Sequence, residues 1–201
     1  ELRRRIEGIK KNDGGGGARR FSEDSFLGPL QIVRGALHEI RVEEWRDAPA
    51  AYGLAHAIAG LINAQTGKPA FWIREGRADC ALGRPYGCGL TDFGIDPSKF
   101  VIIQPRNIEE ALWAMEEVVN VAGIGVVFAE FMKSHRRLDL TATRRLQLAA
   151  ESSGVTPVLL RSVTDREASA ARTRWLVSPA PSAPNIYDLK ASGNSRWRVQ
   201  L

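Results

Sequence analysis

The 201-residue sequence lacks any apolar run that approaches the roughly 20 residues needed to cross a bilayer, so no membrane span is expected. Its first residues carry charges with no apolar segment behind them, which argues against a secretory signal. Only two cysteines are present, Cys80 and Cys88, and they lack the spacing of metal ligands. A disulfide framework is therefore not expected, and we predict a cytoplasmic protein.

Histidine is also scarce. His38, His56 and His135 are scattered over an expected strand, helix and loop, without ligand spacing. His38 lies in an apolar strand, which is more typical of a hydrogen-bonded core histidine than of a metal ligand. No serine occupies a nucleophile elbow. We therefore predict no catalytic residue, no metal and no cofactor.

The most informative absence is that of a phosphate-binding loop. Between an expected strand at residues 36–40 and an expected helix at residues 50–62, the chain reads Arg-Val-Glu-Glu-Trp-Arg-Asp-Ala-Pro. Nucleotide-binding loops at this position need glycines for close backbone approach, a lysine for the phosphates and a Ser or Thr for the metal. Residues 41–49 contain none of these and carry three carboxylates, which repel a polyphosphate. We predict that no nucleotide binds there; an ATPase with an unconventional site stays open as an alternative.

Two features imitate parts of a nucleotide site. Gly67 and Lys68 resemble a fragment of a phosphate loop, but Pro69 follows and the chain enters a strand, so a plain turn is favoured. Glu130 follows an expected strand at residues 124–128, where nucleotidases keep a carboxylate that orients a metal. Without a cradle or a second acid, a local cap or ion pair is the favoured interpretation of Glu130, and a site role stays open.

Hydrophobic periodicity predicts the fold class. Short apolar runs alternate with amphipathic helices. Asn107 with Glu110 can begin one helix, Asp139 or Thr141 can cap another, and Gly154 stands where a helix stop is expected. The pattern predicts an α/β protein with a mostly parallel sheet flanked by helices, and antiparallel strands at its C-terminal edge. The runs at residues 124–128 and 155–160 should be parallel neighbours. The expected segments are strands at 36–40, 70–73, 100–103, 124–128, 155–160, 173–177 and 197–199, helices at 50–62, 107–119 and 138–153, and mobile or partner-facing loops at 75–96 and 178–195.

The first 20 residues are expected to be an appendage to a core domain at residues 21–201. Residues 1–11 fit one short helix whose apolar side carries Leu2, Ile6 and Ile9, and four glycines behind it form a flexible tether. The stripe is a candidate docking surface for a partner or a second copy. A frayed terminus is the equally open alternative.

Positive charge gathers before and along the expected helix at 138–153. The net charge of +5 permits contact with nucleic acid without proving it. Single-stranded DNA binding is one hypothesis, and a solvated helix face is the alternative. The candidate DNA contacts are Lys133, Arg136, Arg137, Arg144, Arg145 and Arg166.

Three stretches together resemble one known family. Residues 27–40 read Leu-Gly-Pro-Leu-Gln-Ile-Val-Arg-Gly-Ala-Leu-His-Glu-Ile, and residues 138–161 and 173–182 continue the match. From residue 26 onward, the chain closely resembles the ImuA family. The most specific part of the resemblance is Asp-Leu-Thr-Ala-Thr-Arg-Arg-Leu-Gln-Leu-Ala-Ala-Glu. These are RecA-like proteins of bacterial DNA-damage mutagenesis cassettes. Arg-Trp-Arg at residues 196–198 resembles the start of a C-terminal tail, which implies a truncated chain.

The resemblance implies a RecA-like core and an accessory role in SOS-induced translesion synthesis. The implied partners are ImuB, an error-prone replicative-type DNA polymerase and RecA, with self-association as a further hypothesis. Three departures from RecA count against RecA-like strand exchange. The phosphate loop is missing, and the DNA-binding loop is reduced to residues 164–171. The catalytic glutamate of RecA would fall near Glu75, where the alignment to RecA is not fixed. We therefore predict a non-catalytic scaffold, with a single-strand DNA-binding module and a weak ATPase as alternatives.

Overall fold

The computed structural model describes residues 32–74, 83–131, 135–162, 168–188 and 190–201. They form a seven-stranded sheet in the order β3-β2-β4-β5-β1-β6-β7, in which the last pair is antiparallel and every other pair is parallel. The predicted fold class is confirmed, including the parallel pairing of β4 with β5. The strands are β1 (His38–Val42), β2 (Ala70–Arg74), β3 (Phe100–Ile103), β4 (Val126–Phe131), β5 (Thr156–Ser162), β6 (Thr173–Ala180) and β7 (Arg196–Gln200).

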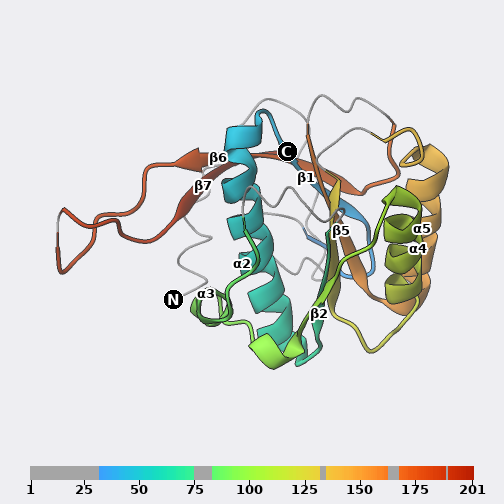
Figure 1. Ribbon diagram of the computed structural model, residues 1–201, viewed down its shortest axis with the longest axis horizontal. Coiled ribbons are helices and arrows are strands. Elements are labelled where there is room, and N and C mark those ends of the chain that lie inside the picture. Colours follow the sequence, from blue (N-terminus) through green and yellow to red (C-terminus); the bar gives the residue numbers. More distant parts are fainter. Residues whose placement is uncertain (1–31, 75–82, 132–134, 163–167, 189) are drawn as a thin grey trace.

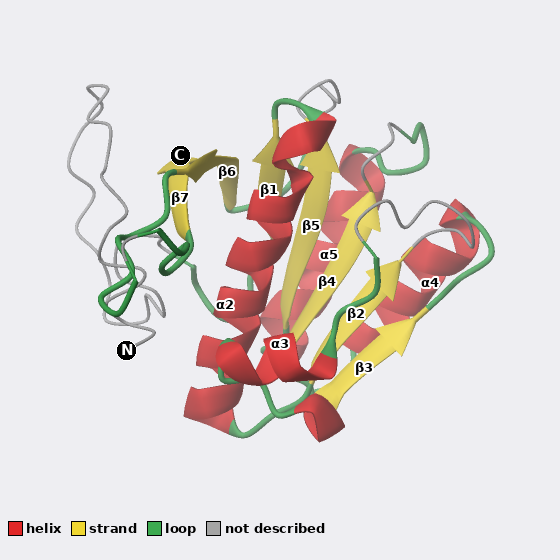
Figure 2. Ribbon diagram, turned by 60° about the vertical axis from the view of Figure 1, so that its left-hand side comes forward, coloured by secondary structure: helices red, strands yellow, loops and turns green. Residues whose placement is uncertain are grey.

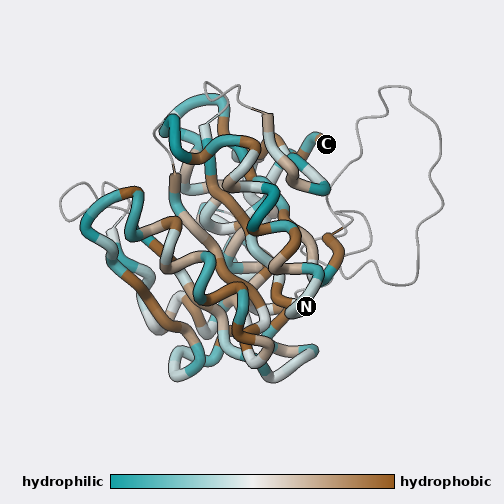
Figure 3. Tube along the Cα trace, turned by 90° about the vertical axis from the view of Figure 1, so that its right-hand side faces the viewer, coloured by the Kyte–Doolittle hydropathy of each residue, from teal (hydrophilic) through white to brown (hydrophobic). Residues whose placement is uncertain are grey.

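Helices cover both faces of the sheet. In Figure 2, α2 (Ala48–Thr66) lies in front of the strands, while α4 (Ile108–Val119) and α5 (Leu140–Ser153) lie behind them. Because side chains alternate along a strand, Val127 and Phe128 enter different cores, one under α4 and α5 and the other under α2. The tube in Figure 3 shows the hydrophobic stretches running through the interior and hydrophilic ones at the outer bends. Among the described residues, no helix is long and apolar enough to cross a bilayer.

Local hydrogen bonds set the ends of the helices. The Asp139 carboxylate accepts a hydrogen bond from the Ala142 amide at 2.8 Å and caps the start of α5. The side-chain oxygen of Asn107 accepts one from the Glu110 amide at 2.9 Å and caps the start of α4. Gly154 ends α5 with a φ of 75°, a left-handed conformation in which a side chain would be strained. These caps and the stop at Gly154 agree with the sequence.

A close backbone approach explains one glycine inside α2. A Cβ atom added to Gly60 would lie 1.9 Å from the carbonyl oxygen of Phe93. Glycine therefore lets the turn after α3 (Gly87–Asp92) pack directly on α2. The buried side chain of Ile95 follows that turn into the core under α2.

Several predicted boundaries are wrong. The first strand begins at His38, because the Leu37 amide donates to the Gln147 side chain at 2.8 Å instead of to a strand. Strand β4 continues to Phe131, so Glu130 lies within the strand and not after it. The expected loop at 75–96 contains α3. At the expected loop 178–195, β6 continues to Ala180 and β7 begins at Arg196.

Candidate functional site

The carboxyl ends of β2 and β4 form a polar cluster beneath α2. Arg74 and Glu130 are register partners on these two parallel strands. Trp72 lies two residues before Arg74, so its side chain points to the same face of the sheet. Helix α2 contributes Tyr52 and His56, which lie one turn apart. In open α/β sheets, this edge is where ligands bind.

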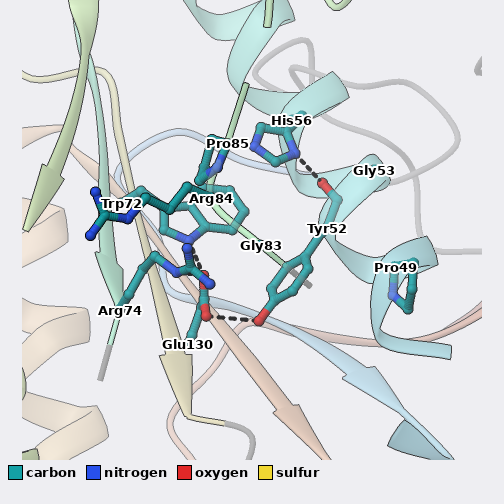
Figure 4. A pocket seen from close by; sticks show the side chains of 10 residues that line it. All are labelled: Pro49, Tyr52, Gly53, His56, Trp72, Arg74, Gly83, Arg84, Pro85 and Glu130. Atoms are coloured by element: carbon teal, nitrogen blue, oxygen red, sulfur yellow. Dashed lines mark hydrogen bonds and ion pairs between the residues drawn. The ribbon is translucent and has the colours of Figure 1, made fainter. Parts of the chain in front are cut away.

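Glu130 is the centre of this cluster. The Tyr52 hydroxyl donates to its Oε2 at 2.8 Å, and the indole N–H of Trp72 donates to Oε1. The Nε of Arg74 lies 3.0 Å from the same Oε1, and the Arg74 and Glu130 side chains are only 4% and 12% exposed. Figure 4 shows these side chains converging on the carboxylate. Because both oxygens are engaged, Glu130 acts as a buried acceptor and counter-ion rather than a free general base.

A cavity of about 260 Å³ lies beside this cluster. Its walls combine aromatic rings with charged groups of both signs, and Arg84 and Pro85 border it from the segment before α3 (Figure 4). This volume admits a small group but falls below the range typical of drug-sized ligands. The described residues contain no group of three or more His, Cys, Asp or Glu that could hold a metal ion.

His56 packs as an aromatic wall of the cluster. Its ring stacks on Trp72 with centroids 4.6 Å apart and an interplanar angle of 6°. Its Nδ1 lies 2.7 Å from the carbonyl oxygen of Tyr52, so Nδ1 carries the proton in the neutral ring. Burial lowers the pKa of His56 to about 4, against the weaker opposing effect of that backbone hydrogen bond. His56 is therefore neutral at pH 7.

His38 is the core histidine that the sequence predicts. It is fully buried, with Nδ1 2.7 Å from the Thr173 hydroxyl and Nε2 2.9 Å from the Val33 carbonyl oxygen. Burial lowers the pKa of His38 to about 4, opposed by the Val33 hydrogen bond and reinforced by the charge of Arg172. Its hydrogen bonds tie β1 to β6, which is a structural role.

The turn from β1 into α2 carries acid where a phosphate cradle would be needed. Glu43 and Glu44 are exposed, and a short 3-10 helix, η2 (Trp45–Asp47), leads directly into α2 with Pro49 in its first turn. Proline has no N–H to offer an anion, and carboxylates oppose phosphate at a helix N-terminus. The prediction that no nucleotide binds here stays a prediction.

The described candidate DNA contacts lie before and along α5, and all four are exposed. Arg137 lies 2.9 Å from Glu109 and Arg145 pairs with Glu116, so α4 supplies carboxylates to two of them. Arg136 and Arg144 make no ion pair with described residues. Lys133 and Arg166 lie outside the described residues, and the DNA hypothesis is untested.

Other predicted positions also lie outside the described residues: Leu2, Ile6, Ile9, Glu75 and Cys80. Cys88 is a free, exposed thiol. Sequence reasoning considered Glu130 but missed its partners on α2 and β2. The sequence shows the alternation of Trp72 and Arg74 and the helical spacing of Tyr52 and His56. Only the register of β2 with β4 and the position of α2 show that these residues meet at Glu130.

These features define an α/β protein whose sheet is covered on both faces and whose carboxyl edge is occupied by its own side chains. No family model matches the chain. It is 33% identical over 185 residues to Protein ImuA of Caulobacter vibrioides strain NA1000 / CB15N. The match covers 87% of this chain and 69% of that protein. Protein ImuA of C. vibrioides strain ATCC 19089 / CIP 103742 / CB 15 matches with the same identity and coverage. The chain belongs to the ImuA family.

The fold is also similar to solved structures. The crystal structure of SulA from Pseudomonas aeruginosa matches with a TM-score of 0.45 and 14% identity, over 62% of this chain and 97% of that one.

Replacing Glu130 with Gln should strongly destabilise the fold. The amide keeps the shape but leaves the buried guanidinium of Arg74 without a counter-ion. We expect the free energy of unfolding to fall by about 3 kcal/mol, measured by urea denaturation and tryptophan fluorescence. Glu44→Gln is the matched control, since its pair with Arg46 is exposed and should change stability by less than about 1 kcal/mol. Equal effects of the two substitutions would contradict the role of Glu130.

Stability should fall on acidification because of the two buried histidines. Each has a folded pKa of about 4, while histidine in an unfolded chain titrates near about 6.5. Between these values the unfolded chain binds more protons, so the contribution is complete above pH 6.5 and is lost as the pH falls to 4. Unfolding of wild-type protein and His56→Asn at pH 7.5 and 4.5 tests this. The difference in stability between the two pH values should be smaller in the variant by about 2 to 3 kcal/mol; equal differences would contradict it.

Proposed function

We propose that this protein is a non-catalytic accessory factor of SOS-induced DNA-damage tolerance. It brings ImuB, an error-prone replicative-type polymerase and RecA together for translesion synthesis. The observation that carries this proposal is the 33% identity to Protein ImuA over 185 residues, which extends across 87% of the chain. A mostly parallel sheet with helices on both faces is compatible with the RecA-like core that the family resemblance implies.

The carboxyl edge of the sheet supports a role without catalysis. Glu130, the acid best placed to assist a reaction, is held by Tyr52, Trp72 and Arg74. The turn before α2 presents Glu43 and Glu44 to solvent and has no glycine, lysine, serine or threonine of a phosphate-binding loop. Both features favour a scaffold over an ATPase. Nucleotide hydrolysis needs a loop that binds the phosphates and a carboxylate that is available to a metal or a water molecule.

The first residues are the proposed docking element. Burial of Leu2, Ile6 and Ile9 against a partner would stabilise a complex by roughly 1.5 to 3 kcal/mol for each side chain. Such a contact would attach this protein to RecA or to a second copy. ImuB and the polymerase would then be concentrated where replication stalls.

Binary binding of the full chain to purified ImuB, polymerase and RecA tests the proposal. We expect wild-type protein to bind at least one of these partners, and the triple variant Leu2→Ala, Ile6→Ala, Ile9→Ala to lose at least tenfold in affinity for RecA or in self-association. Val121→Ala, Leu140→Ala, Leu148→Ala is the matched control, since it removes three exposed apolar side chains elsewhere.

Two results would count against the proposal, and they differ in meaning. Binding of none of the three proteins by the wild-type chain would contradict the scaffold function itself. Full-strength RecA binding and self-association by a folded triple variant would remove only the docking element.

A further inference from the structure

The antiparallel pair β6–β7 ends in a hairpin arm. Figure 1 shows this arm, in red, extending away from the helices and the rest of the sheet. Its base is firmly attached: Val177, Trp197 and Val199 are buried in the core under α2. A Cβ atom on Gly53 of α2 would lie 3.2 Å from the Trp197 ring, which shows how closely the helix and the ribbon pack. The arm therefore projects from a rigid support.

The opposite face of the ribbon is basic. Side chains alternate along β7, so Arg196 and Arg198 both point away from α2, and both are exposed. They lie roughly 7 Å apart along the strand. Their register partners on β6 are the small residues Ala180 and Ser178, so no carboxylate faces them across the ribbon.

These two arginines differ from four other exposed arginines in their ion pairs. Arg46, Arg106, Arg137 and Arg145 each pair with a glutamate. Among the described residues, neither Arg196 nor Arg198 makes an ion pair, and Lys190 near the tip makes none either. The neighbouring acid is Asp188, whose carboxylate accepts from the Lys190 backbone amide at 2.8 Å. The arm thus carries a net positive charge.

The tip holds two large side chains in water. Ile186 is 84% exposed and Tyr187 is 93% exposed. The side chain of Asn185 accepts from the amides of Tyr187 and Asp188 at 2.9 and 3.1 Å, which defines the turn. A β-bridge between Pro184 and Ser192 closes the loop behind them. These contacts hold the backbone of the turn that carries the exposed ring.

We propose that this arm binds single-stranded nucleic acid. Proteins that bind single strands without sequence preference combine unpaired cations that contact phosphates with aromatic rings on which bases stack. Tyr187 supplies the ring, and Arg196 and Arg198, with Lys190, supply the cations. An apolar pocket on a partner protein could receive Ile186 and Tyr187, but it would leave the row of cations unexplained. The arm uses none of the arginines of α5.

The test is fluorescence anisotropy of the full chain with a labelled 20-nucleotide oligo-dT over a series of salt concentrations. Arg196→Ala, Arg198→Ala should weaken binding and reduce the slope of log K against log salt by roughly 1.4. Tyr187→Ala should weaken binding at least about fivefold without changing that slope, and Tyr187→Phe should retain binding because the ring remains. The matched control is Arg46→Ala, Arg106→Ala, which removes the same charge from other exposed sites and should bind like wild type.

Several outcomes would overturn the proposal. They are wild-type protein that fails to bind at low salt, arm variants that bind like wild type, or a control variant that loses as much as the arginine variant. Loss of binding to a protein partner by the Tyr187 variant, with oligo-dT binding intact, would assign the tip to protein docking instead. The proposed scaffold function is measured separately by ImuB and RecA binding, which the arm variants should keep.

Discussion

One buried carboxylate holds together the edge of the sheet on which ligands would otherwise be expected. Glu130 joins β4 to β2 through Arg74 and Trp72, and to α2 through the Tyr52 hydroxyl. Removing one partner of a charged pair this deeply buried is costly, because the other charge is left without a counter-ion. The contacts therefore depend on one another, and the neutral ring of His56 completes the packing by stacking on Trp72.

This arrangement has a functional consequence. In α/β proteins that act on nucleotides, the carboxyl edge keeps free backbone donors and a carboxylate available to orient a metal. Here the carboxylate is engaged, and the first turn presents acids to solvent. Interaction surfaces are then expected on projecting segments rather than in the fold's ligand crevice. The β6–β7 arm is one such segment, since it extends away from the core and carries the exposed Tyr187. It also carries the exposed Arg196 and Arg198, which make no ion pair with described residues.

Much of the fold was predictable because its signals are local. The caps at Asn107 and Asp139 and the stop at Gly154 depend on atoms within a few residues, so periodicity and residue type suffice to find them. Helix α3 was missed because its six residues include two glycines and no apolar repeat. The Glu130 cluster was not predictable, because the pairing of β2 with β4 and the position of α2 bring together residues up to 78 positions apart. The arm was expected as a loop, since its proline and serine content conceals the turn formed by Asn185.

The central claim is that a sheet of this class serves here as a scaffold without a nucleotide. Isothermal titration calorimetry of Mg-ATP into the 201-residue chain tests it most directly, because it needs no partner and no assumption about a reaction. We expect no saturable heat at physiological nucleotide concentrations, since the turn before α2 carries Glu43 and Glu44 and has no glycine, lysine, serine or threonine of a phosphate-binding loop. Saturable binding of Mg-ATP with a Kd in the micromolar range would contradict the claim.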